Sequence, residues 1–86
     1  MSRARSLDKI QNSDWITISE LVQITSMRYS TLKYYTEEGL IPYEQLDSRL
    51  VRRYPRVEAI KRINEINQLK INGLTIGEIK NRLVKD

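Results

Sequence analysis

Two short helical patterns separated by only two or three residues constrain the fold of this chain more than any other feature. In the first, Thr17 stands three residues before Glu20, the spacing of a capping box, so a helix should begin at Ile18. The second should run over residues 28–38 and end at Gly39, which tolerates a left-handed backbone. So short a link forces the helices to cross sharply, which predicts a helix-turn-helix.

The apolar positions indicate which faces of these helices meet. We expect Leu21 and Ile24 to pack against Leu32 and Tyr35, with Tyr29 on the same buried face. The opposite face of the second helix is left to solvent and consists of Ser30, Thr31, Lys33 and Tyr34. Hydroxyl groups can donate to base edges or phosphates, and a lysine can meet a phosphate. Taken alone, the tyrosine could equally cover a neighbouring helix and the lysine could be a solvated side chain.

Basic residues concentrate after the second helix. The 86 residues include 15 Lys and Arg against 11 Asp and Glu, a net charge of +4. Residues 49–62 hold one acid, Glu58, and six cations, namely Arg49, Arg52, Arg53, Arg56, Lys61 and Arg62. A local excess of positive charge is what a polyanion-binding surface requires, because neutralised phosphates release counterions. A solvated helix face remains the alternative for Lys61 and Arg62.

Between the second helix and Pro55 the pattern is that of a β-hairpin. Residues 42–54 contain two short extended segments that flank a polar loop, and Pro42 is acceptable at an edge. The loop has no Gly or Asn to specify a turn type. Arginines on the returning segment predict a wing that holds the sugar-phosphate backbone beside the helix-turn-helix.

The rest of the chain predicts two more helices. Pro55 suits a first helical turn, and the apolar period of about 3.6 that follows predicts a long helix over residues 56–72. Thr75 and Glu78 repeat the capping-box spacing and should begin the last helix, with its apolar residues inward. The predicted fold class is therefore mainly α, a winged helix-turn-helix with about four helices and a two-stranded β-hairpin wing.

The N-terminal residues carry the weakest pattern. Residues 1–14 are predicted as a flexible basic arm or a loose first turn, and residues 15–86 as the single folded domain, beginning with a stub of strand at Trp15. A domain of this size has one modest core and little room for an enclosed pocket.

Composition argues against several functions. The chain has no Cys and no His, which removes the commonest zinc ligands and thiol or imidazole catalysis, so we expect neither an enzyme nor a metal or cofactor site. No apolar run approaches the roughly 20 residues of a membrane span, and no signal peptide is evident. We therefore expect a cytoplasmic protein without a membrane partner.

Four motifs at their expected separations resemble the N-terminal winged-helix domain of the MerR-type (mercury-resistance regulator) family, over residues 16–83. They are Ile18-Ser19-Glu20-Leu21, Thr31-Leu32-Lys33-Tyr34-Tyr35 with Glu38-Gly39-Leu40-Ile41-Pro42, Arg52-Arg53-Tyr54, and Gly73-Leu74-Thr75-Ile76-Gly77-Glu78-Ile79-Lys80. The resemblance implies a second helix in the major groove and a wing on phosphates. The DNA-contacting set would then be Arg28, Ser30, Thr31, Lys33, Tyr34, Arg49, Arg52 and Arg53.

Two positions depart from the family pattern. Ser26 stands where the family usually has the Gly of the turn, and Arg28 stands where a Ser or Thr would cap the helix. We expect a less regular turn there, with Arg28 as an added phosphate contact.

The leading hypothesis is a small MerR-like transcriptional regulator that binds specific double-stranded DNA and lacks an effector domain, since family regulators continue into a long coiled coil. Its partners would be DNA, further copies of itself on DNA, and RNA polymerase or a recombinase. The alternatives are an excisionase-like factor that bends DNA for recombination, and a domain excised from a longer regulator. A different class, a protein-interaction adaptor, would use the tyrosines as a contact surface, and RNA binding is a further alternative.

Overall fold

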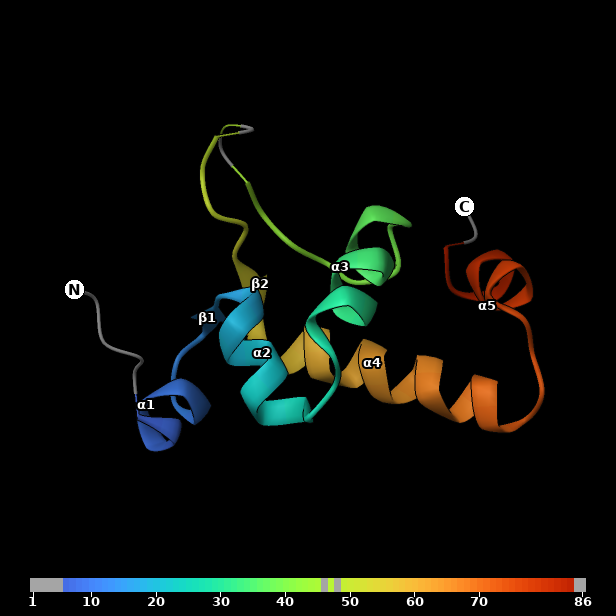
Figure 1. The fold of residues 1–86 in the computed structure, drawn as a ribbon, viewed down its shortest axis with the longest axis horizontal. Coiled ribbons are helices and arrows are strands. Elements are labelled where there is room, and N and C mark those ends of the chain that lie inside the picture. The colour runs from blue at the N-terminus through green and yellow to red at the C-terminus, as the bar shows by residue number, and fades with distance from the viewer. Residues whose placement is uncertain (1–5, 46, 48, 85–86) are drawn as a thin grey trace.

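The computed structural model describes residues 6–45, 47 and 49–84, which form five helices and two short strands (Figure 1). In chain order these elements are α1 (Leu7–Gln11), β1 (Trp15–Ile16), α2 (Ile18–Thr25), α3 (Tyr29–Glu37), β2 (Tyr54–Pro55), α4 (Arg56–Ile71) and α5 (Ile76–Leu83). The long helix α4 lies along one side, and α3 and the wing (residues 42–54) project on the same side of it. The mainly α, winged helix-turn-helix class is confirmed.

Local sequence signals fix where α2 and α5 begin. At α2 the Thr17 Oγ1 accepts from the Glu20 N–H at 3.2 Å, and the Thr17 N–H donates to Glu20 Oε1 at 2.9 Å. Thr75 and Glu78 make the same pair of bonds at α5, at 3.2 and 2.8 Å. The backbone hydrogen bond from Thr75 holds the pKa of the Glu78 carboxyl below its ordinary value. Both predicted capping boxes are confirmed.

The turn between α2 and α3 has an unusual backbone for its residue. Ser26 has φ 59°, a left-handed conformation that costs a non-glycine residue about 1–2 kcal/mol. Its N–H donates to the Val22 carbonyl at 2.8 Å, which closes α2. Gly39, after α3, has φ 75° as expected of a glycine that ends a helix. The less regular turn that we expected is therefore found at Ser26, where a serine adopts a backbone conformation that favours glycine.

The core draws residues from every helix and both strands. Its fully or almost fully buried apolar residues are Ile10, Ile16, Leu21, Leu32, Tyr35, Leu40, Ile41, Tyr54, Ala59, Ile63, Ile66 and Ile79. The predicted packing of Leu21 on Leu32 and Tyr35 is confirmed, and Ile24 is partly buried against this cluster. The placement of Tyr29 in the core was wrong, because its side chain is 53% exposed. Burial on α3 begins one turn later, at Leu32.

The strand pairing extends beyond the predicted hairpin. β1 pairs antiparallel with β2, with Trp15 opposite Pro55 and Ile16 opposite Tyr54. Within the wing, the described residues form one antiparallel bridge, in which the Glu44 and Arg53 N–H groups donate to each other's carbonyls at 2.7 and 2.9 Å. The wing is thus hairpin-shaped, while the paired strands tie its base to the start of the helix-turn-helix.

The structure places a helix in part of the predicted N-terminal arm. Ser6 caps α1, because its Oγ accepts a hydrogen bond from the Lys9 N–H at 3.3 Å. Ile10, on the same helix, is fully buried in the core. Of the two options for residues 1–14, a flexible arm or a loose first turn, a helical turn is found over α1, because a single apolar side chain anchors it. Residues 1–5 lie outside the described residues.

Candidate nucleic-acid interface

The two faces of α3 differ sharply. Leu32, Tyr35 and Thr36 are buried and fix the helix against the body of the domain. The predicted solvent face is found where it was expected: Ser30 and Lys33 are exposed, Thr31 is half-buried and Tyr34 is 44% exposed. Hydroxyl groups and an ammonium therefore share one accessible helix face.

The N-terminus of α3 is open, unlike those of α2 and α5. Arg28 occupies the capping position with an extended backbone, and its side chain makes no capping hydrogen bond within the described part of the chain. The side chain is exposed. The first amide groups of a helix carry partial positive charge, so an arginine there adds to an anion-attracting end.

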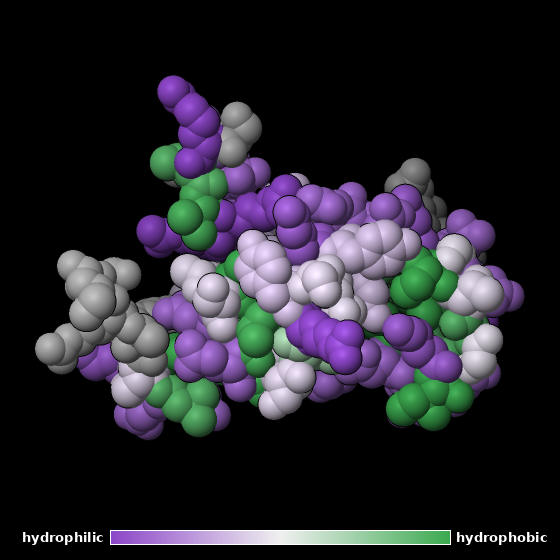
Figure 2. Space-filling model, viewed as in Figure 1, coloured by the Kyte–Doolittle hydropathy of each residue, from purple (hydrophilic) through white to green (hydrophobic). Residues whose placement is uncertain are grey.

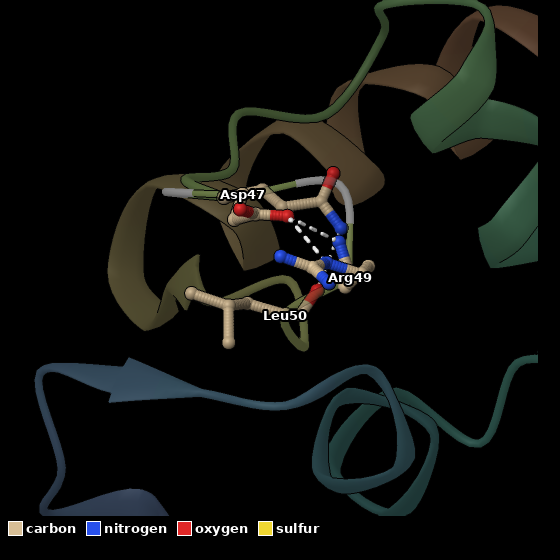
Figure 3. Close-up of polar contacts among 4 residues, drawn as sticks. Asp47, Arg49 and Leu50 are labelled. Carbon is tan, nitrogen blue, oxygen red and sulfur yellow. Dashed lines mark hydrogen bonds and ion pairs between the residues drawn. The ribbon is translucent and has the colours of Figure 1, made fainter.

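The three wing arginines lie in three different environments. The Arg49 side chain is 89% exposed and turns back toward Asp47, with Nε 3.5 Å from Oδ1 (Figure 3). Arg53 is exposed, and its backbone forms the bridge to Glu44. Arg52 is half-buried, and its Cζ lies 5.2 Å from the centre of the Tyr43 ring. Figure 2 shows hydrophilic side chains over the projecting wing, interrupted by apolar ones.

A buried polar contact joins α3 to the base of the wing. Thr36 Oγ1 donates to the Leu32 carbonyl at 2.7 Å and lies 2.9 Å from the Tyr54 hydroxyl. Because the threonine proton is already used, Tyr54 is the donor in this second bond. Burial raises the pKa of the Tyr54 phenol, against the smaller opposing effects of the Thr36 hydrogen bond and the Arg52 charge.

Part of the basic segment serves the fold instead of the surface. Arg56 Nε donates to the Ser13 carbonyl at 2.7 Å. Arg62 Nη1 donates to the Leu40 carbonyl at 3.2 Å, and its Nε lies 3.5 Å from Glu65. The charge excess of residues 49–62 is therefore divided: the wing arginines are exposed or half-buried, whereas Arg56 and Arg62 tie distant backbone segments together. Charge counting along the sequence cannot make that distinction.

Two tyrosines that were not assigned to the DNA surface lie beside it. Tyr29 is exposed on the first turn of α3, next to Arg28. Tyr43 is 40% exposed at the base of the wing and carries Arg52 on its ring. Neither position stands out in the sequence, because an exposed aromatic residue gives no periodic signal.

The family model described as "MerR HTH family regulatory protein" matches residues 16–85. The chain belongs to the MerR HTH family. The predicted membership, and with it a DNA-binding, transcription-regulating helix-turn-helix, is confirmed at the level of the family. The match begins at Ile16, the second residue of β1, includes β2, α2 to α5 and the wing, and leaves α1 outside.

Two further comparisons found no match for this MerR-family chain, one among curated proteins and one among solved structures. None of the helices within residues 6–45, 47 and 49–84 combines the length and apolar character that crossing a membrane requires.

Proposed function

We propose that the chain binds specific sequences in double-stranded DNA as a small MerR-like transcriptional regulator, with α3 in the major groove and the wing on the phosphate backbone. The observation that carries this proposal is the joint presentation of two surfaces. The helix α3, which carries the exposed polar face, and the wing, which carries the arginines, project on the same side of α4, and the Thr36–Tyr54 contact joins α3 to the base of the wing. A cytoplasmic location follows from an intracellular DNA target.

Each candidate residue has a role that matches its chemistry. Ser30, Thr31 and Tyr34 supply hydroxyl groups for base edges or phosphates, and Lys33 supplies a point charge for a phosphate. The arginines at positions 28, 49, 52 and 53 would contact phosphates, which positions the protein without reading sequence.

Salt dependence tests the phosphate contacts. Duplex affinity, measured by fluorescence anisotropy, should fall steeply with salt concentration, and Arg53→Ala should weaken all sequences alike and reduce the log–log slope by about one. Lys9→Ala is the matched control, because it removes an equal charge from α1. An affinity indifferent to salt, or equal effects of the two variants, would contradict the wing proposal.

Sequence preference tests the helix. Thr31→Val and Tyr34→Phe each remove one hydroxyl from α3, and the variant that loses a base contact should lose about 1–3 kcal/mol of discrimination at one base pair. Selection from a randomised duplex pool would measure this. Wild-type preference and affinity in both variants would remove these hydroxyls from the proposed base-reading set.

The process served by DNA binding has two candidate forms. A regulator would bind as a homo-oligomer over a promoter and act on RNA polymerase, whereas an excisionase-like factor would bend DNA for a recombinase. Footprinting on the DNA that surrounds the protein's own coding region separates them. Protected sites over a promoter support the regulator, and tandem sites beside a recombination site support the architectural factor.

A protein-interaction adaptor is a second candidate, favoured by apolar side chains between the wing and β1. Trp15, Leu50 and Val51 are exposed and, with Glu44 and Arg53, line a groove of about 440 Å³. Exposed apolar groups with polar neighbours often mark protein contacts. Val51→Lys should abolish such a contact while leaving duplex affinity intact or raised. Loss of duplex binding in the absence of any protein partner would contradict the adaptor role for this groove.

A further inference from the structure

We propose that Tyr43 is a positioning residue that holds Arg52 for a DNA phosphate, which makes Arg52 the preorganised arginine of the wing. The proposal rests on the proposed DNA binding and adds a residue outside the predicted contact set. It also predicts that the wing arginines contribute unequally, although each carries the same charge.

A continuous series of contacts runs from α3 to the Arg52 guanidinium. Thr36 on α3 is hydrogen-bonded to the fully buried Tyr54 at 2.9 Å. The Tyr54 ring lies 6.2 Å from the Tyr43 ring, at an interplanar angle of 45°. The Tyr43 ring in turn lies 5.2 Å from Arg52 Cζ. These contacts connect the position of the Arg52 guanidinium to that of α3, the helix proposed to enter the major groove.

The chemistry of the ring contact suits a phosphate-binding arginine. A guanidinium above an aromatic face is attracted by the π system, and this contact does not occupy its N–H donors. Because Nε is buried and the guanidinium also interacts with the Tyr54 hydroxyl, the donors offered to a phosphate are those on the accessible part of the group. Immobilisation before binding also lowers the entropy lost when the complex forms.

Partial burial of the Arg52 side chain also supports its role as a preorganised arginine. Its Nε is buried and has no hydrogen-bond partner among the described residues, while the residue as a whole is only half-buried. Burial of Nε places one edge of the guanidinium inside the protein, and a buried donor without a partner costs free energy, so the charge is incompletely compensated. An anion at the accessible part of the group would compensate that charge.

Arg49 provides the contrast within the same wing. It is 89% exposed, and its cation is already 3.5 Å from the Asp47 carboxylate, which would have to be released before a phosphate could take its place. A long exposed side chain also loses more rotamer freedom on binding than a stacked one. Arg49 should therefore contribute to the electrostatic attraction of DNA but little to the positioning of the wing on a phosphate.

A mutant cycle on the full chain tests the positioning role. Tyr43→Leu removes the ring and keeps apolar bulk, and Tyr43→Phe keeps the ring. Duplex affinity should fall about threefold in Tyr43→Leu and stay near wild type in Tyr43→Phe, from the usual strength of an exposed cation–π contact. The Tyr43→Leu effect should vanish in an Arg52→Gln background and persist in an Arg49→Gln background. Urea unfolding of each variant checks the fold.

A DNA-independent measurement separates this proposal from the proposed function. The Nε proton of Arg52 should exchange slowly with water in NMR spectra of the free wild type and rapidly in Tyr43→Leu. Slow exchange in both proteins would overturn the positioning role. So would a threefold Tyr43→Leu effect that persists in the Arg52→Gln background, because Tyr43 would then touch DNA itself. Failure of the wild type to bind duplex would instead contradict the DNA-binding function, whatever the exchange data show.

Discussion

The helix-turn-helix and the wing of this MerR-family chain are held in shape by different means. α2 and α3 meet through side chains with almost no exposed surface, such as Leu21 and Leu32. The described residues of the wing form one antiparallel bridge, between Glu44 and Arg53, and those at its tip are exposed. Burial determines the position of the helix, whereas a few polar and aromatic contacts determine that of the wing. Substitutions should therefore affect folding in the first region and mainly DNA binding in the second.

The largest expected effect tests this difference directly. Leu32→Ala removes a fully buried side chain between α2 and α3 and should cost about 3 kcal/mol of unfolding free energy, from lost burial and the cavity left behind. Val51→Ala, at a wing position that is 67% exposed, should change stability by less than about 0.5 kcal/mol. Urea denaturation measures both. Comparable losses would show that the wing, too, is stabilised by burial.

Tyr54→Phe tests the contact that joins the two regions. The variant loses the hydrogen bond to Thr36, which should cost about 1.5 kcal/mol. Because burial raises the Tyr54 pKa, the wild type should lose stability as the pH rises above 10.0, the ordinary pKa of tyrosine, through the higher folded-state value. The Tyr54→Phe variant should lose less stability than the wild type between pH 10.0 and the folded-state pKa of Tyr54. Identical alkaline profiles from pH-dependent urea titrations would contradict the assigned burial effect.

The turn of the helix-turn-helix offers a stabilising change. Ser26→Gly should raise the unfolding free energy by about 1 kcal/mol, because glycine adopts the left-handed conformation without the steric cost. Gly39→Ala is the opposite control. A Cβ at Gly39 would meet nothing within 4 Å, so the expected loss of about 1 kcal/mol comes from the backbone alone. Thermal unfolding should move in opposite directions for the two variants.

The smallest expected effect lies at the wing tip. Arg49→Gln removes an exposed ion pair with Asp47 and should change stability by less than about 0.5 kcal/mol. Duplex affinity should nevertheless fall in a salt-dependent way. A stability loss comparable to that of Leu32→Ala would erase the distinction between the two regions.

Features encoded by neighbouring residues could be predicted from the sequence. The starts of α2 and α5 depend on residue pairs three positions apart, Thr17 with Glu20 and Thr75 with Glu78, and the helix that follows Pro55 shows its own period. Of the candidate site, the exposed face of α3 follows from the same periodicity. These inferences need no knowledge of what the helices pack against.

Features that depend on distant contacts could not be predicted. The exposure of Tyr29 depends on where the neighbouring helices stop covering α3, and Arg56 is withdrawn from the surface by a carbonyl 43 positions earlier. The stacking of Arg52 on Tyr43 likewise requires the wing to fold back on itself. The charge pattern identified the basic segment but could not assign its members to the fold or the surface.

The pairing of β1 with β2 also bears on how the chain folds. Ile16 and Tyr54 are partners although 38 positions separate them, so closing this loop costs more chain entropy than forming the contacts between the adjacent α2 and α3. We expect α2 and α3 to associate early and the strand pair to close late in the folding reaction. The wing, which lies inside that loop, would then take its final place only in the last step.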